Sequence, residues 1–403
     1  MSLQNVEKTV RDPQSCQAVV SKLDVDAEFR IPMWLYRYRD NKTGWVLSIA
    51  THAEPNSQKY SLGGFRIAPA ARAEAPGYDN DAEAIGLGVG MDEKVYWSRL
   101  IKIGGTLGLN KIDRIVGGKC VLLPSRGSRV GEQNDFALLD FALACLKDFE
   151  ETSGIFLTTG QDLGHGILSD GKSDSIQYMY ERFRGSIVSD TSQPTAAGNY
   201  FVLSGALQGL GIKMEKATIG LHGCGNIGIH LLERLRNTGA TLLVCEFSEA
   251  RRAAIQEMGI QTFSPEEKME FLSLPMDALA VNANGASLDS KALATINENP
   301  AIEFICGCEN LAMPVSDGAE ILRQARKMFC PTELCGMMGY LTAVEEYHSR
   351  QAGKAFKFED MFKPAEKLEE VSRRAAELVL KKNFACGFDQ AVRELYMPAN
   401  KAA

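Results

Sequence analysis

The alternation of apolar and polar positions changes along the chain. Between Pro32 and His52, apolar residues occupy every second position on both sides of Asp40–Gly44, which predicts a β-hairpin. From Ala217 onward, short apolar runs alternate with segments whose apolar residues recur every three or four positions. Repeated strand–helix units build a parallel sheet, with ligands at the carboxyl ends of its strands. The pattern therefore predicts an α/β protein.

Four further segments are interpreted from their composition and spacing. Residues 1 to about 30 resemble an amphipathic helix and a linker, and Asp92 to Leu107 has helical spacing. Ala68 to Gly90 is rich in Ala, Gly, Pro and Asp, which favours an inserted loop. Pro364 to Lys382 is expected to form a charged amphipathic helix.

The most informative stretch runs from Ala217 to Glu246. An apolar strand leads into Gly223, Gly225 and Gly228, a helix follows, and a second apolar strand ends at Glu246. A Rossmann-type site needs these parts, because the glycines admit the pyrophosphate to the helix N-terminus and the acid binds the ribose. The alternative is an ordinary βαβ unit with a glycine-rich turn.

Glu246 also bears on the choice of cofactor. A carboxylate at this place attracts the 2′-hydroxyl of NAD and repels the 2′-phosphate of NADP, so NAD is expected and NADP is less favoured. Arg251 and Arg252 follow closely and would neutralise a phosphate if they faced it. The alternative is that both are solvated charges on the next helix.

Composition excludes several classes of protein. The length of 403 residues allows two or three domains, and 45% hydrophobic with 24% charged residues is typical of a globular protein. A net charge of −7 argues against a nucleic-acid partner. No apolar leader or bilayer-spanning run is present, so we expect no membrane association and a cytoplasmic location. The ten cysteines lack a metal-ligand pattern, and we expect reduced thiols and no metal.

Two residues are candidates for proton transfer. Lys119 stands between two glycines and an apolar strand, and a partly desolvated lysine can act as a general base near neutral pH. Asp162 follows a predicted buried strand in a glycine-flanked loop, a common place for catalytic groups. Taken singly, each has a structural alternative: a lysine extending from a strand end, and an aspartate that caps a turn.

In their order, these segments resemble the glutamate/leucine/phenylalanine/valine dehydrogenase family, and most closely its leucine dehydrogenase-like members. The similar motifs span about residues 60 to 346: Leu62-Gly63-Gly64-Phe65-Arg66, Gly117-Gly118-Lys119, Thr158 to Gly164, Pro194 to Gly198, Gly223 to Gly228, Gly307 to Asn310, and Pro331 to Glu346. Each motif alone is weak, whereas the ordered set is fairly specific.

The resemblance implies an NAD-dependent amino-acid dehydrogenase, which reversibly deaminates an apolar or unusual L-amino acid to its 2-oxo acid. It implies that Lys119 is the catalytic base and Asp162 the second catalytic residue. The substrate-binding residues implied are Leu62, Gly63, Gly64, Thr195, Tyr340 and Ala343. The cofactor-binding residues implied are Gly223, Gly225, Asn226, Ile227, Gly228, Glu246, Asn282 and Asn310.

The chain departs from the family at the substrate carboxylate. The family has a lysine twelve residues before the catalytic one, and the ungapped position here is Leu107. Lys111 or Lys102 substitutes only if the intervening loop is re-threaded, and Lys111 is our candidate for binding substrate. Gly336 also replaces a family asparagine. The alternatives are therefore an amine or modified-amino-acid dehydrogenase, and a non-catalytic NAD-binding protein.

Two domains are expected. Residues 1–198 should form the substrate domain, with the helices of residues 340–403 packing back on it. Residues 199–339 should form the Rossmann NAD-binding domain. Beyond its small-molecule substrate, the chain is expected to bind copies of itself as a homo-oligomer.

Overall fold

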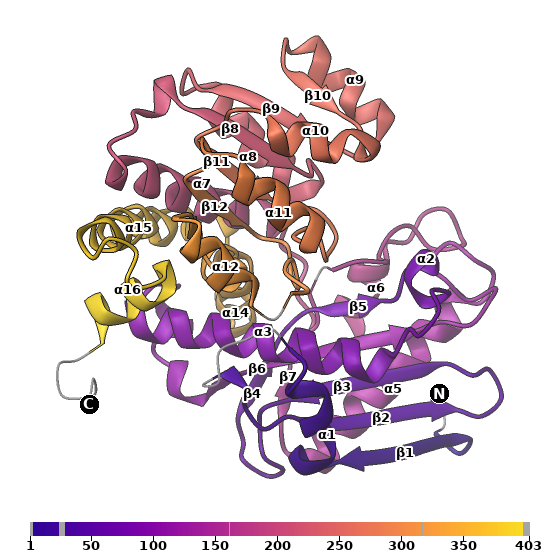
Figure 1. Cartoon of the computed structure of the whole chain (residues 1–403). Coiled ribbons are helices and arrows are strands. Elements are labelled where there is room, and N and C mark those ends of the chain that lie inside the picture. The colour runs from indigo at the N-terminus through magenta and orange to yellow at the C-terminus, as the bar shows by residue number, and fades with distance from the viewer. Residues whose placement is uncertain (1–2, 24–28, 161, 316, 398–403) are drawn as a thin grey trace. The chain divides into compact units, whose positions relative to one another are not determined.

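The structure is a computed structural model that describes residues 3–23, 29–160, 162–315 and 317–397. The chain divides into two compact units, drawn in Figure 1. The first unit comprises residues 1–96, 106–190 and 340–358, and the second comprises residues 97–105, 191–339 and 359–403. In the described residues, no helix is both long and apolar enough to cross a bilayer.

The first unit is built on a mixed, seven-stranded sheet. Its strand order is β1-β2-β3-β6-β4-β7, and β5 also pairs with β6. The antiparallel pair of β2 and β3 confirms the predicted hairpin. The strands are β1 (Val6–Arg11), β2 (Trp34–Asp40), β3 (Val46–Thr51), β4 (Tyr60–Leu62), β5 (Phe65–Ile67), β6 (Ile115–Leu123) and β7 (Phe156–Leu157).

Helices cover both faces of this sheet (Figure 1). Cys120 and Leu122 of β6 belong to the core under α5 (Asp135–Ser153). Val121, which points to the other face, belongs to the core under α3 (Asn80–Ile101). Alternate residues of a strand share a face, so Lys119 emerges on the α3 side with Val121. The register of β6 thus decides where the candidate base lies.

The predicted loop at Ala68 to Gly90 is wrong in its second half, since α3 begins at Asn80. Glycine-rich composition suggested a loop, but the apolar residues of this segment are buried along the helix. Gly88 lets the helix approach the sheet, because a Cβ there would lie 2.7 Å from Met33 Cε. The N-terminal prediction is also wrong in part: Val6–Arg11 (β1) pairs with β2, and an α-helix follows at Pro13–Val20 (α1).

The second unit contains a six-stranded, fully parallel sheet. Its order is β10-β9-β8-β11-β12-β13, the doubly wound order of a Rossmann domain. The prediction of a Rossmann-type α/β fold is confirmed. The strands are β8 (Thr218–His222), β9 (Thr241–Cys245), β10 (Gln261–Phe263), β11 (Ala278–Val281), β12 (Phe304–Gly307) and β13 (Met328–Phe329).

Two long helices of the second unit pack closely on each other, α7 (Ser192–Gly209) and α15 (Phe362–Lys381). Gly205 makes this possible, since a Cβ there would lie 2.0 Å from the Glu369 carbonyl oxygen. Ser372 donates a hydrogen bond to the Val202 carbonyl at 2.6 Å. The unit boundaries therefore differ from the expected ones: residues 191–198 and 359–403 belong with the dinucleotide-type unit, and only 340–358 return to the first.

The remaining helices connect these strands. In the first unit they are α2 (Ala70–Ala73), α4 (Thr106–Leu109) and α6 (Ser175–Arg182); α14 (Met337–Gln351) lies largely in it. In the second unit they are α8 (Asn226–Arg236), α9 (Glu249–Glu257), α10 (Lys268–Ser273), α11 (Ser290–Glu298), α12 (Gly318–Gln324), α13 (Thr332–Cys335) and α16 (Phe388–Tyr396).

Candidate active site

Two glycine pairs bring the strands of the first unit unusually close together. A Cβ at Gly63 would lie 1.7 Å from the Gly118 carbonyl oxygen, and one at Gly118 would lie 2.1 Å from Ser61 Oγ. Larger residues at these positions would force the strands apart. A Cβ at Gly64 would lie 2.8 Å from Lys119 Nζ. The absence of a side chain at Gly64 therefore lets the Lys119 head group lie against the backbone there.

Lys119 and Asp162, 43 positions apart in the sequence, form a buried ion pair. The exposed fraction of the side chain is 4% for Lys119 and 13% for Asp162. Arg66 donates two further hydrogen bonds to the Asp162 carboxylate, from Nε at 3.3 Å and from Nη2 at 3.1 Å. A single carboxylate thus faces two cations.

This arrangement controls the protonation of Asp162. Burial alone would raise the pKa of its carboxyl, because a low-dielectric environment disfavours the charged form. The opposing charges and hydrogen bonds of Lys119 and Arg66 are stronger, and they hold the pKa of Asp162 well below its usual range. Asp162 is therefore a carboxylate at neutral pH.

The row of alternating charges continues beyond Arg66. Its Nη1 donates to Glu83 of α3, and Arg72 Nε lies 3.2 Å from the same Glu83 oxygen. Glu83 is buried, whereas a third of the Arg72 side chain is exposed. Sequence reasoning missed Arg66 and Glu83, although an arginine inside an apolar strand such as Phe65–Ile67 is a signal for a buried ion pair.

Lys94 is a second residue that sequence reasoning missed. It lies on α3 with only 6% of its surface exposed. Glu83 and Lys94 are eleven residues apart, about three helical turns, so they share the face of α3 that contacts Arg66. Met91, one turn before Lys94, lies 3.4 Å from a Cβ placed at Gly63. The signal was a lysine on an otherwise apolar stripe of a helix.

Lys111 lies elsewhere in the first unit. Its Nζ is 5.6 Å from the centre of the Tyr60 ring and 3.5 Å from His348 Nδ1. Tyr60 pairs with Ile115, four residues before Lys119 on β6, which places that ring roughly 13 Å along the strand. The structure therefore does not bring Lys111 to the Lys119–Asp162 pair.

Leu107 occupies a capped turn. The amides of Leu107 and Gly108 donate to the Glu345 carboxylate at 3.0 and 2.8 Å. Glu345 lies on α14, so this contact fixes α4 to that helix. Lys102, the other lysine considered for the carboxylate, belongs to the second unit.

The other predicted substrate residues are distributed over both units. Leu62 is buried at the end of β4, and Tyr340 and Ala343 lie on the part of α14 that belongs to the first unit. Thr195 belongs to the second unit, where its hydroxyl donates to the Thr191 carbonyl at 2.6 Å.

The glycine motif of the second unit has the local geometry of a phosphate-binding turn. Gly223 adopts φ +90°, which favours glycine, and Gly225 is the N-cap residue of α8. A Cβ at Gly228 would lie 2.2 Å from the Gly223 carbonyl oxygen, so the third glycine allows helix and strand to pack. A Cβ at Gly225 would have no neighbour within 4 Å among the described residues. The open side at Gly225 fits a pyrophosphate at the N-terminus of α8, which begins with Asn226 and Ile227.

Glu246 lies at the carboxyl end of β9 and is buried. Its Oε2 accepts the Cys224 amide of the glycine turn at 2.7 Å, and its Oε1 accepts the Ser248 amide at 2.8 Å. Arg251 Nη1 lies 3.3 Å from Oε1. A carboxylate oxygen can accept more than one hydrogen bond, so Glu246 remains able to bind ribose hydroxyls.

Asn282 occupies the carboxyl end of the neighbouring strand, β11. Its Oδ1 accepts hydrogen bonds from Asn199 Nδ2 and from the Cys308 amide, each at 3.0 Å. Its Nδ2 is buried and has no hydrogen-bond partner in the described part of the chain. A buried donor without an acceptor is costly, and a bound ligand would satisfy it. Asn310 follows β12 at the adjacent strand end.

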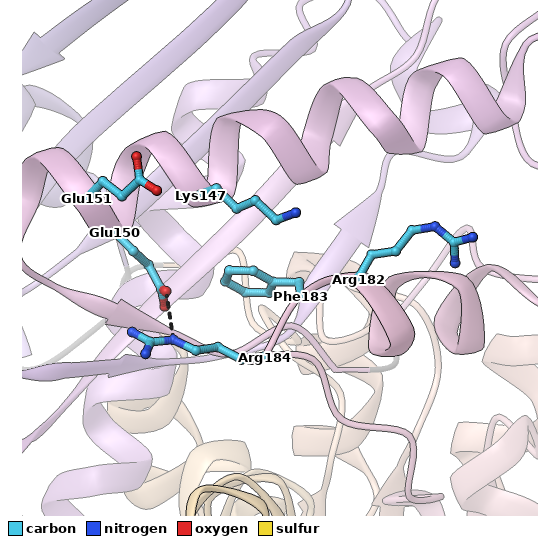
Figure 2. Close-up of a pocket in the computed structure, with 6 residues that line it drawn as sticks. All are labelled: Lys147, Glu150, Glu151, Arg182, Phe183 and Arg184. Carbon is cyan, nitrogen blue, oxygen red and sulfur yellow. Dashed lines mark hydrogen bonds and ion pairs between the residues drawn. The ribbon is translucent and has the colours of Figure 1, made fainter. Parts of the chain in front are cut away.

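One surface pocket lies away from these groups. Figure 2 shows this pocket of about 470 Å³, into which Phe183 projects near the Glu150–Arg184 ion pair. None of the predicted site residues lines it; the lining residues are Lys147, Glu150, Glu151, Arg182, Phe183 and Arg184. Among the described residues, no three His, Cys, Asp or Glu side chains gather in a way that would hold a metal ion.

Comparisons with known proteins identify chains of similar sequence and fold. The chain is 23% identical to leucine dehydrogenase of Bacillus cereus over 163 residues. This aligned segment covers 40% of the chain and 43% of that protein. The structure of an L-tryptophan dehydrogenase from Nostoc punctiforme superposes with a TM-score of 0.59 at 18% identity. The superposition covers 87% of this chain and 91% of the tryptophan dehydrogenase chain. The hetero-hexameric glutamate dehydrogenase of Thermus thermophilus matches 98% of the chain and 87% of its own, with a TM-score of 0.63 at 13% identity.

The chain has the fold of an amino-acid dehydrogenase. The resemblance inferred from the ordered motifs is thereby confirmed. The sequence match spans less than half the length of the curated relatives, and no protein-family model matches the chain.

Proposed function

We propose that this protein catalyses the reversible, NAD-dependent oxidative deamination of an apolar or unusual L-amino acid. The single observation that carries the proposal is the buried Lys119–Asp162 pair, which lies against Gly64. Two further observations support the proposal. Arg66 is a second cation beside the Asp162 carboxylate, and the other unit contains a glycine turn of the dinucleotide-binding type.

In the proposed reaction, the glycine turn at Gly225 and the Glu246 carboxylate would hold NAD, which would supply a hydride acceptor for Cα of the amino acid. The iminium that results is attacked by water, and Lys119 as a free amine takes the proton of that water. The ionised Asp162 then accepts or returns protons at the substrate nitrogen as ammonia leaves. Because the two groups are in contact, the protons they bind belong to the pair rather than to either residue.

Lys94 is our candidate for binding the substrate carboxylate. It is a buried ammonium on the face of α3 that also carries Glu83, and an ammonium is a strong partner for a carboxylate. Lys111 is less suited, because its ammonium lies near Tyr60 and His348. Arg66 is engaged by Asp162 and Glu83. The apolar Leu62, with Tyr340 and Ala343, favours a substrate with an apolar or aromatic side chain.

NAD is favoured over NADP by Glu246. Its buried carboxylate would accept hydrogen bonds from the two ribose hydroxyls and repel a 2′-phosphate. Arg251 already pairs with Glu246, and Arg252 donates to the Glu246 and Phe247 carbonyls at 2.7 Å. Neither arginine is thus left to compensate a phosphate at this strand end.

A substrate panel tests the proposal. NADH formation is measured with apolar, aromatic and acidic L-amino acids, and with the amines that lack their carboxyl group. Turnover of amino acids but not of the amines supports the proposal. Turnover of the amines instead supports an amine dehydrogenase, and NAD binding without any turnover supports a non-catalytic NAD-binding protein.

A further inference from the structure

Arg66 is buried beside Asp162 but has no role in the proposed reaction steps. It is 5% exposed, and its guanidinium contacts Asp162 on one side and Glu83 on the other. We propose that Arg66 is a positioning residue: it shares the Asp162 carboxylate with Lys119, and so keeps Lys119 able to exchange its proton during turnover. The inference rests on the proposed function.

The geometry of the contact is that of an orienting clamp. Arg66 Nε reaches Asp162 Oδ2 at 3.3 Å and Nη2 reaches Oδ1 at 3.1 Å, so both carboxylate oxygens are held by one rigid plane. Glu83 holds the far side of the guanidinium through Nη1. A lysine at position 66 would keep the charge but lose this two-point contact.

The clamp also divides the charge of Asp162 between two cations. With Arg66 present, the carboxylate of Asp162 stabilises both Arg66 and the ammonium of Lys119. Without Arg66, it would pair with Lys119 alone, and a neighbouring positive charge that disfavours the ammonium would be lost. In a protein without Arg66, the stronger pairing with Asp162 and the loss of the neighbouring positive charge would both keep Lys119 protonated to a higher pH.

Other ionisable groups surround the clamp, and one of them is Lys94, a buried cation on the face of α3 that also carries Glu83. Glu83 on α3 and Arg72 on α2 form its outer end. Burial and Glu83 raise the pKa of Tyr78, which is neutral at physiological pH. Burial lowers the pKa of His165, which lies near Asp162 and whose Nε2 is 2.8 Å from the Phe65 carbonyl oxygen. Arg66 is thus the permanently charged group that contacts the Asp162 carboxylate together with Lys119.

The proton balance of the step shows why this matters. Water attacks the iminium carbon, its proton moves to the free amine of Lys119, and the carbinolamine forms. Lys119 is then an ammonium beside Asp162 and must release that proton before the next turnover. A Lys119 that pairs with Asp162 alone would release it only at higher pH, so a smaller fraction of the enzyme would carry the free amine at neutral pH.

The experiment compares Arg66→Met, Arg66→Lys and the control Arg72→Met. Arg72 contacts the same Glu83 oxygen but does not contact Asp162. The pH profile of kcat/KM is measured with the best amino acid, and the pH midpoint of Lys119 acetylation by trace acetic anhydride is followed by peptide mass spectrometry. Arg66→Met is expected to move both midpoints upward by about one pH unit. It should also lower kcat/KM at neutral pH by about tenfold, the factor that a one-unit rise of the midpoint gives.

Arg66→Lys is expected to restore the midpoints to within a few tenths of a unit while kcat stays reduced, since charge returns without orientation. Arg72→Met should leave both midpoints unchanged. If Arg66→Met does not fold, Arg66→Gln, which keeps a donor without the charge, carries the same expectation. A variant that loses activity and thermal stability with unmoved midpoints would overturn the inference and leave Arg66 a structural residue.

Failure of the inference is distinguishable from failure of the proposed function. A wild-type protein that turns over no amino acid would defeat the proposed function. The acetylation midpoints do not require turnover, so they would still decide whether Arg66 governs Lys119. A catalytically active protein whose midpoints are the same with and without Arg66 would defeat the inference alone.

Discussion

At the scale of single residues, the Lys119–Asp162 pair combines burial with an excess of neighbouring positive charge. Removing one partner of a buried pair leaves the other uncompensated, which costs more than the pair itself contributes. Arg66 moderates that penalty for Asp162, because it remains when Lys119 is changed. A Lys119 variant is therefore expected to fold.

The carboxylate-binding role proposed for Lys94 gives a prediction with a matched control. Lys94→Met should raise KM for the amino acid by about a hundredfold, because a buried charge-assisted contact to the carboxylate is lost. Lys111→Met removes a lysine of the same unit that lies near Tyr60, and it should leave KM within about twofold. Steady-state kinetics decides between them, and a larger KM change at Lys111 would reverse the assignment.

His348 gives a prediction about pH. Burial, with Lys111 and Arg114 nearby, lowers its pKa to about 4 in the folded chain, against 6.5 for the free side chain. Below pH 6.5 the unfolded chain takes up a proton that the folded chain refuses, so stability falls as pH drops towards 4. The loss from this group reaches about 3 kcal/mol.

Urea denaturation at a series of pH values measures this effect. His348→Asn should show a flatter decline between pH 6.5 and 4 than the wild-type chain. Parallel declines in the two proteins would mean that His348 does not cause the loss. Below pH 4 both states of His348 are protonated, so the two curves should then run parallel.

At the scale of elements, two glycines of the turn before α8 have different roles: Gly228 allows helix and strand to pack, and Gly225 faces the proposed ligand. Gly228→Ala should destabilise the fold by about 2 kcal/mol, because its Cβ would overlap the Gly223 carbonyl. Gly225→Ala meets open space and should leave the unfolding midpoint unchanged while weakening NAD binding. Thermal unfolding and NADH fluorescence titration measure the two effects. Equal effects of both changes on stability would contradict this division.

Sequence periodicity predicted the elements unevenly. The strands of the Rossmann unit were predicted because each is a short apolar run bounded by glycines or helices. The start of α3 was missed, because Gly86, Gly88 and Gly90 resemble loop residues, and sequence alone does not show that Gly88 packs against Ala50 of β3. Lys94 was missed for another reason: it lies within the predicted helix Asp92 to Leu107, but a position twelve residues before Lys119 was expected to bind the carboxylate, and that position is Leu107.

At the scale of the whole molecule, each unit brings together residues that the sequence separates. The first unit joins Arg66, Glu83, Lys119 and Asp162 through the register of β5 and β6 and the packing of α3. Periodicity gives the face of a helix but not its partner, so the packing of α15 on α7 was not predictable. The motif order therefore predicted the pair Lys119–Asp162, whereas Arg66 required the three-dimensional structure.

The expected homo-oligomer is a prediction for the whole molecule. Light scattering should then give a mass that is a multiple of 44.1 kDa. A single 44.1 kDa species at micromolar concentration would contradict the prediction.

The most direct test of the proposed function is amino-acid-dependent NADH formation by the wild-type chain and by Lys119→Ala, with ammonia and 2-oxo acid measured in the same samples. The account predicts equal amounts of the three products from the wild type. It predicts a decrease of about a thousandfold or more in Lys119→Ala, which should retain NAD binding and its fold. Wild-type rates from Lys119→Ala, or NADH without ammonia, would contradict it.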